Sequence, residues 1–90
     1  MSDKNPFRTR QIRRSILDTL QMAGGYALES GALETFVNDQ LRPPLQPDEW
    51  REAVNFLCLG EYIAIVPNDM DTTMKQWCIT ERGKTLLRSA

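Results

Sequence analysis

The sequence predicts one small α+β domain, in which three helices are followed by a two-stranded hairpin and a short final helix. Apolar residues recur at helical spacing in three segments, and glycine or proline separates each segment from the next. Two runs of β-branched and aromatic residues, 62–66 and 77–79, then flank a polar loop over residues 68–73. Such runs are typical of strands, and the short connection predicts that they pair antiparallel.

The predicted third helix, over about residues 46–60, carries the clearest signals. Pro47 suits the first turn of a helix, and the next two residues are acidic, as the helix dipole favours at that end. Gly60 predicts the end of the helix. Trp50 lies at the centre of an apolar face, whose other members follow at i+3, i+4, i+7 and i+8: Ala53, Val54, Leu57 and Cys58.

The other elements are predicted from similar patterns. An amphipathic helix over residues 9–23 ends at a glycine pair, and residues 26–28 suit a short edge strand. A second helix runs from a Ser30 cap to about Leu41, before a proline pair, and Thr80 is placed to cap the final helix. The three apolar stripes are expected to meet in one core. The residues expected in contact there are Ile16, Leu20, Phe36, Trp50, Val54 and Leu57.

Length and composition fit a single domain. Ninety residues, of which 41% are hydrophobic, are enough for one core but not for a core and an enclosed active-site cleft. We expect a basic arm over residues 1–8 and one domain over residues 9–90. No apolar run approaches the ~18 residues of a membrane span, and no signal peptide is visible, which predicts a cytoplasmic protein without membrane contact. Cys58 and Cys78 fall in apolar runs without metal-ligand spacing, and we expect them in the core as free thiols.

Charge is distributed unevenly along the chain. Residues 1–14 carry five basic side chains and one acidic one, whereas residues 15–71 carry two basic and ten acidic ones. Residues 72–90 again carry four basic side chains against one acidic one. A contact with nucleic acid would use the two ends, because lysine and arginine supply most of the sequence-independent affinity for phosphates. The alternative is that these are ordinary solvated faces.

The predicted order of helices and strands is that of a small winged helix. The segment Ile79-Thr80-Glu81-Arg82-Gly83, an apolar residue followed by Thr-x-x-Gly, resembles the pattern after the second wing strand of many winged-helix transcription regulators. Residues 57–62 resemble the segment that leads from their recognition helix into the wing. Ile16-Leu17, Ala23-Gly24-Gly25-Tyr26 and the same Thr-Glu-Arg-Gly are also similar to small uncharacterised winged-helix proteins of Mu-like prophages. The resemblance implies the fold, and DNA binding as what winged helices commonly do.

The expected partner is therefore duplex DNA, and the third helix and the basic ends are its expected contacts. Arg51 has the donor geometry to bind guanine, and Asn55 has the geometry to bind adenine. Asp48 and Glu52 lie on the same side and would face phosphates, so we expect affinity to depend more on the basic arm than on this helix. The residues predicted to contact DNA are Arg8, Arg10, Arg13, Arg14, Arg51, Asn55 and Lys75.

The alternative function is a protein-interaction or phage accessory module that does not bind DNA, or a homodimer, with Phe56 and Leu59 as its exposed contacts. We expect no catalysis, because the chain has no histidine and therefore no Ser-His, Cys-His or zinc-hydrolase site. Asp69-Met70-Asp71-Thr72 resembles the aspartate motif of haloacid-dehalogenase-type phosphatases, but those enzymes need a larger parallel sheet than this chain builds. We expect no cofactor, and no metal ion at this aspartate pair, which lacks further ligands.

Overall fold

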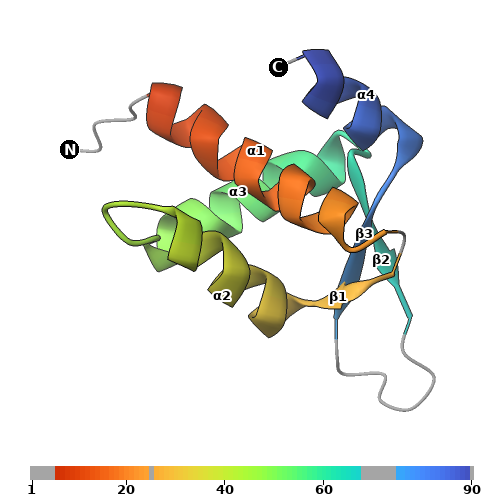
Figure 1. The fold of residues 1–90 in the computed structure, drawn as a ribbon, viewed down its shortest axis with the longest axis horizontal. Helices are drawn as coiled ribbons and strands as arrows, with labels where there is room; N and C mark the ends of the chain where they lie inside the picture. The colour runs from red at the N-terminus through yellow and green to blue at the C-terminus, as the bar shows by residue number, and fades with distance from the viewer. Residues whose placement is uncertain (1–5, 25, 68–74, 90) are drawn as a thin grey trace.

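A computed structural model of the chain describes residues 6–24, 26–67 and 75–89, and it confirms the predicted α+β class (Figure 1). The elements, in chain order, are α1 (Pro6–Met22), β1 (Leu28–Glu29), α2 (Ser30–Gln40), α3 (Pro47–Leu59), β2 (Ile63–Val66), β3 (Gln76–Ile79) and α4 (Glu81–Ser89). The strands form a sheet in the order β1-β3-β2, and both neighbouring pairs are antiparallel, as the hairpin prediction requires. The polar loop predicted over residues 68–73 lies outside the described residues.

The boundaries of α3 are those that the sequence predicts. Gln46 is the N-cap, Pro47 is the first helical residue, and Gly60 is the C-cap. Gly60 is required by a close approach rather than by a left-handed backbone, because a Cβ at this position would collide with the ring of Tyr62. The left-handed residue is Glu61, with φ of 61°.

Two other helix starts differ from the prediction. α1 begins at Pro6 rather than at Thr9, so Arg8 lies in the helix and not in the arm predicted over residues 1–8. Proline is well suited to a first helical position because it has no N–H to leave unpaired. The N-cap of α2 is Glu29 rather than Ser30, and its Oε1 accepts the backbone N–H of Gly31 at 2.9 Å.

The core lies between the three longer helices and one face of the sheet, with α1 crossing in front of α3 (Figure 1). Because of helix periodicity, one apolar stripe of each of these helices faces the core. The sheet contributes one buried residue from β2 and one from β3. The buried apolar residues are Ile12, Ile16, Leu17, Leu20, Leu33, Val37, Leu41, Ala53, Leu57, Ile63 and Trp77.

The predicted core contacts are correct for Ile16, Leu20 and Leu57 and wrong for Phe36, which is 52% exposed. Phe36 lies about 100° around the helix from Val37, outside the buried stripe of α2. Trp50 and Val54 are half-buried at the edge of the core instead of at its centre. Trp77 of β3 supplies the buried indole ring in place of Trp50.

The two thiols are also less buried than predicted. Cys58 packs against the core and Cys78 lies on β3, and both are half-buried. Both are free thiols.

The Thr80-x-x-Gly83 motif joins α4 to the turn between α3 and β2. Thr80 Oγ1 donates to the carbonyl oxygen of Glu61 at 2.7 Å and accepts the backbone N–H of Gly83 at 3.0 Å, which confirms the predicted cap. The backbone N–H of Thr80 donates to the carbonyl oxygen of Tyr62 at 3.1 Å. A Cβ at Gly83 would collide with that same oxygen, so glycine is what lets α4 lie against Tyr62.

Replacing Gly83 with alanine tests this close approach. In an unconstrained helix interior, alanine is favoured over glycine by about 1 kcal/mol. Here the added Cβ meets a backbone oxygen, so we expect Gly83→Ala to lower the free energy of unfolding by about 2 kcal/mol in urea denaturation. Thr85→Ala, at an exposed position of the same helix, is the control and should change it by less than about 0.5 kcal/mol. A Gly83→Ala protein as stable as the parent would contradict the described packing.

Candidate functional site

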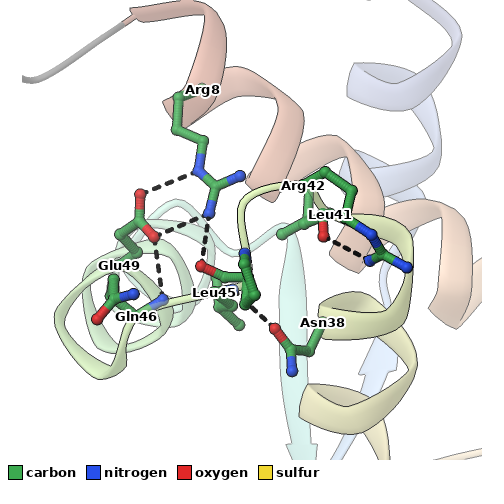
Figure 2. Close-up of polar contacts among 8 residues, drawn as sticks. Arg8, Asn38, Leu41, Arg42, Leu45, Gln46 and Glu49 are labelled. Carbon is green, nitrogen blue, oxygen red and sulfur yellow. Dashed lines mark hydrogen bonds and ion pairs between the residues drawn. The ribbon is translucent and has the colours of Figure 1, made fainter.

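Arg8 of α1 is bound to the first turn of α3 (Figure 2). Its Nε and one terminal nitrogen donate to the two carboxylate oxygens of Glu49 at 3.1 and 3.0 Å, and the same terminal nitrogen donates to the carbonyl oxygen of Pro44 at 3.1 Å. Glu49 also accepts the backbone N–H of Gln46 at 3.0 Å. A bidentate ion pair of this kind fixes the orientation of the two side chains as well as the distance between them, so it connects the start of α1 to the start of α3.

Each member of this ion pair stabilises the charge of the other. The hydrogen bonds from Arg8 hold the pKa of Glu49 below its ordinary value of 4.5, and the hydrogen bonds to Glu49 raise the pKa of Arg8. The side chain of Arg8 is only 14% exposed. Its guanidinium is therefore committed to an internal contact.

Further along α1, arginine contributes to a set of stacked rings. The guanidinium carbon of Arg13 lies 3.5 Å from the centre of the Phe56 ring. Phe56 stacks in turn on Tyr62, with ring centres 6.1 Å apart, and the guanidinium carbon of Arg82 lies 5.3 Å from the centre of the Tyr62 ring. We call these four residues the aromatic ladder. The ladder links α1, α3 and α4, because Arg13, Phe56 and Arg82 lie on these three helices. Each cation–π contact stabilises the link by about 0.5–2 kcal/mol.

The aromatic ladder borders a groove of about 540 Å³ between α1 and α4, which we call the α1–α4 groove. Its apolar lining is Phe7, Leu17, Phe56, Tyr62, Leu86 and Leu87. Its polar lining is Arg10, Gln11, Arg13, Arg14 and Ser89. None of the described residues that line it is acidic, so the groove combines an apolar floor with a positively charged rim.

The outer face of α3 forms a second surface. At about 100° per residue, Asp48 and Asn55 lie opposite the buried Leu57, with Arg51 and Glu52 beside them, and all four are exposed. Leu59 is 77% exposed and does not line the α1–α4 groove. The outer face of α3 is therefore mixed in charge, and none of these four residues lines the α1–α4 groove.

No known protein family matches the chain, and no curated protein sequence matches it significantly. Among solved structures, it is similar to the PcaV transcriptional regulator from Streptomyces coelicolor, described in complex with its natural ligand. The match has a TM-score of 0.68 at 18% sequence identity and covers 84% of this chain. The chain has a winged-helix fold. It spans about half the length of PcaV, since the match covers 48% of that protein.

In this winged helix, α2 and α3 are the consecutive helices of the helix-turn-helix. Lys75 is exposed at the base of the wing, where its carbonyl oxygen accepts the backbone N–H of Ser30 at 2.9 Å. Asp69 and Asp71, expected near the wing tip, lie outside the described residues. The candidate residues thus fall into separate sets. Arg8 is in the ion pair; Arg10, Arg13, Arg14 and Phe56 line the groove; and Arg51, Asn55 and Leu59 are on the outer face of α3.

Sequence reasoning missed Phe7, Tyr62 and Arg82 as parts of a site. A signal for the first was present, because Phe7, Arg10, Arg14 and Leu17 recur at i, i+3, i+7 and i+10, along one side of a helix. The predicted helix begins at Thr9, which leaves Phe7 outside the helix and so hides this pattern. Tyr62 was assigned to a strand, and nothing in the local sequence of Arg82 predicts its contact with that ring.

The described residues contain no group of three or more His, Cys, Asp or Glu side chains placed to hold a metal ion. In the same ranges, no helix is both long enough and apolar enough to cross a membrane.

The Arg8–Glu49 pair is expected to make stability depend on acid pH. Because the folded-state pKa of Glu49 is lowered, its stabilising contribution is fully present above the ordinary value of 4.5 and is lost as pH falls through the lowered pKa. We expect Glu49→Gln to be less stable than the parent by about 1 kcal/mol at neutral pH, with the gap closing as pH falls below 4.5 and through the lowered pKa of Glu49. Urea titrations over a pH series measure the gap.

Arg8→Gln provides the matched variant. This substitution removes the same ion pair by changing its other member. The double variant, Arg8→Gln with Glu49→Gln, should therefore be little less stable than either single variant. A stability gap between parent and Glu49→Gln that stays constant from neutral to acid pH would contradict the pairing.

Proposed function

We propose that this chain is a duplex-DNA-binding protein of the transcriptional-regulator type, which contacts DNA with the outer face of α3 and the base of the wing. The observation that carries the proposal is the placement of α3. It packs on the core through Ala53 and Leu57 and exposes Arg51 and Asn55 on other sides. Helix-turn-helix proteins place such a helix in the major groove, and PcaV, which shares the fold, is described as a transcriptional regulator.

Arg51 and Asn55 lie four residues apart, about one helical turn, and are therefore neighbours on the surface of α3. A guanidinium fits the two acceptors of guanine, and an amide fits the donor and acceptor of adenine. Lys75 adds a phosphate contact from the base of the wing. Asp48 and Glu52 act against binding, so we expect it to be weak, steeply salt-dependent and modestly specific.

The arginines of α1 have no part in this proposed surface. Arg8 is held by Glu49, and the other three line the α1–α4 groove, on a different side of α3 from Asn55. We therefore assign the proposed DNA contacts to α3 and Lys75, while the expectation that DNA affinity depends mainly on the arginines of α1 stays a prediction.

The proposed setting is the cytoplasm, and the proposed origin is a Mu-like prophage. The motifs at Ile16-Leu17 and at residues 80–83 support that origin, because they are similar to those of small winged-helix proteins of such prophages. In that setting, the proposed function is regulation of transcription.

Fluorescence anisotropy of a labelled generic duplex at several salt concentrations tests DNA binding. We expect binding at low ionic strength, with log affinity falling as log salt rises. Lys75→Ala should flatten that slope by about 0.9, the value of one phosphate contact. Arg88→Ala removes the same charge at an exposed position of α4 and should leave the slope unchanged. Absence of salt-dependent binding even at low ionic strength would overturn the proposal.

A selection from a randomised duplex library tests base recognition. If Asn55 binds an adenine, Asn55→Ala should relax the preference at one base position by about 1–3 kcal/mol and leave the other positions unchanged. Lys75→Ala is the contrasting variant, because losing a phosphate contact should weaken binding to all sequences alike. Identical preferences for the parent and Asn55→Ala would remove Asn55 from the proposed surface.

A second candidate function is protein interaction, which the α1–α4 groove favours. Phe7 is 76% exposed and Phe56 is 41% exposed in that groove, beside the leucines of α4. Exposed aromatic and aliphatic groups gathered in one depression are typical of protein contacts. This candidate does not depend on whether α3 binds DNA.

A further inference from the structure

The α1–α4 groove combines apolar area that is in contact with solvent and arginines that form no ion pair within the described part of the chain. Its floor contains Leu17, Leu86 and Leu87, and its exposed aromatic rings leave apolar area in contact with solvent. In the part of the chain that the structure describes, no ion pair joins Arg10, Arg13 or Arg14 to a carboxylate. The Nε of Arg13 is buried and has no acceptor among the described residues.

We propose that the α1–α4 groove binds an amphipathic helix of a partner protein, whose apolar stripe is flanked by glutamate or aspartate. The groove lies between two helices, and the stripe from Phe7 to Leu17 runs along its α1 side. Ten helical residue steps span ~15 Å, which is the length of about three turns of a partner helix. Apolar side chains at i, i+3 or i+4 and i+7 of that helix fill such a groove.

The rim determines the charge of the partner. A guanidinium that stacks on a ring uses its flat face, and its N–H groups still point outward in the plane, where they bind the two oxygens of a carboxylate. Arg13 is stacked in this way on Phe56, and because its Nε is buried, its terminal nitrogens are the donors that a partner carboxylate would reach. Arg10 and Arg14 are exposed on the same side of α1. A helix with carboxylates beside its apolar stripe therefore satisfies both the floor and the rim.

Two other occupants fit the groove less well. A symmetric dimer through this groove would set the same patch against itself, and so would bring six arginines into one interface whose described lining residues include no carboxylate. DNA phosphates would satisfy Arg10 and Arg14 but would leave the leucine floor uncovered, because a sugar–phosphate backbone is polar. The combination of charge and apolar area thus favours an acidic amphipathic helix.

The test uses the full chain and three labelled synthetic peptides of about 18 residues, long enough to be partly helical alone. The first carries leucines at i, i+3, i+4 and i+7 with glutamates beside them. The second has lysine in place of each glutamate, and the third has the composition of the first with its leucines spread around the helix. We expect anisotropy to show that the first binds at least about tenfold more tightly than the other two.

Variants of the chain locate the site. Arg10→Glu with Arg14→Glu should weaken binding of the first peptide by about tenfold or more. Arg51→Glu with Lys75→Glu makes the same change in net charge on another surface and should leave the affinity within about twofold. Thermal melting monitors the fold of both double variants, and Arg10→Gln with Arg14→Gln replaces the first if it is unfolded. Amide shifts on peptide addition should concentrate in α1 and α4.

Several outcomes would overturn the proposal. These are equal binding of the leucine-spread peptide, no binding of the first peptide, or equal weakening by the two charge-reversed double variants. Sedimentation that shows a dimer of the parent, dissociated by Arg10→Glu with Arg14→Glu, would assign the groove to a second copy. If the variant Arg10→Glu with Arg14→Glu lost duplex binding, and the variant Arg51→Glu with Lys75→Glu kept it, the α1–α4 groove would be assigned to DNA.

Discussion

The close contact between the backbone of α4 and the carbonyl oxygen of Tyr62 is the constraint on which the surfaces of this domain depend. Gly83 permits the contact, and Thr80 holds it with hydrogen bonds to the turn after α3. Because α4 is set at this distance, Leu86 and Leu87 reach the side of α1 and line the α1–α4 groove. The same turn holds the Tyr62 ring against Phe56, so the aromatic ladder depends on it as well.

Much of the fold could be predicted from the sequence because its signals are local. The proline at the start of α3, the glycine after its end and the threonine before α4 each act within a few residues. Position in the core is different, because it depends on competition between distant residues. Trp50 and Trp77 are both suitable core residues by type, and only the packing of the hairpin on the helices decides that Trp77 is buried.

The contacts of the arginines of α1 could not be predicted from the sequence, for a related physical reason. Counting charge along the chain groups Arg8, Arg10, Arg13 and Arg14 as one basic arm, yet Arg8 is bound to Glu49 and Arg13 is stacked on Phe56. Both partners lie more than forty positions away in the sequence, in a helix whose own pattern gives no sign of these contacts. The exposed Arg51 and Asn55 were identifiable, since helix periodicity alone sets them away from Leu57.

α3 contributes Phe56 to one surface of the molecule and Asn55 to another, although the two residues are adjacent in the sequence. A helix of 13 residues moves as one rigid body, so a rotation that displaces Phe56 turns Asn55 through the same angle. The surface that contains Phe56 and the surface that contains Asn55 therefore cannot be reoriented independently of each other.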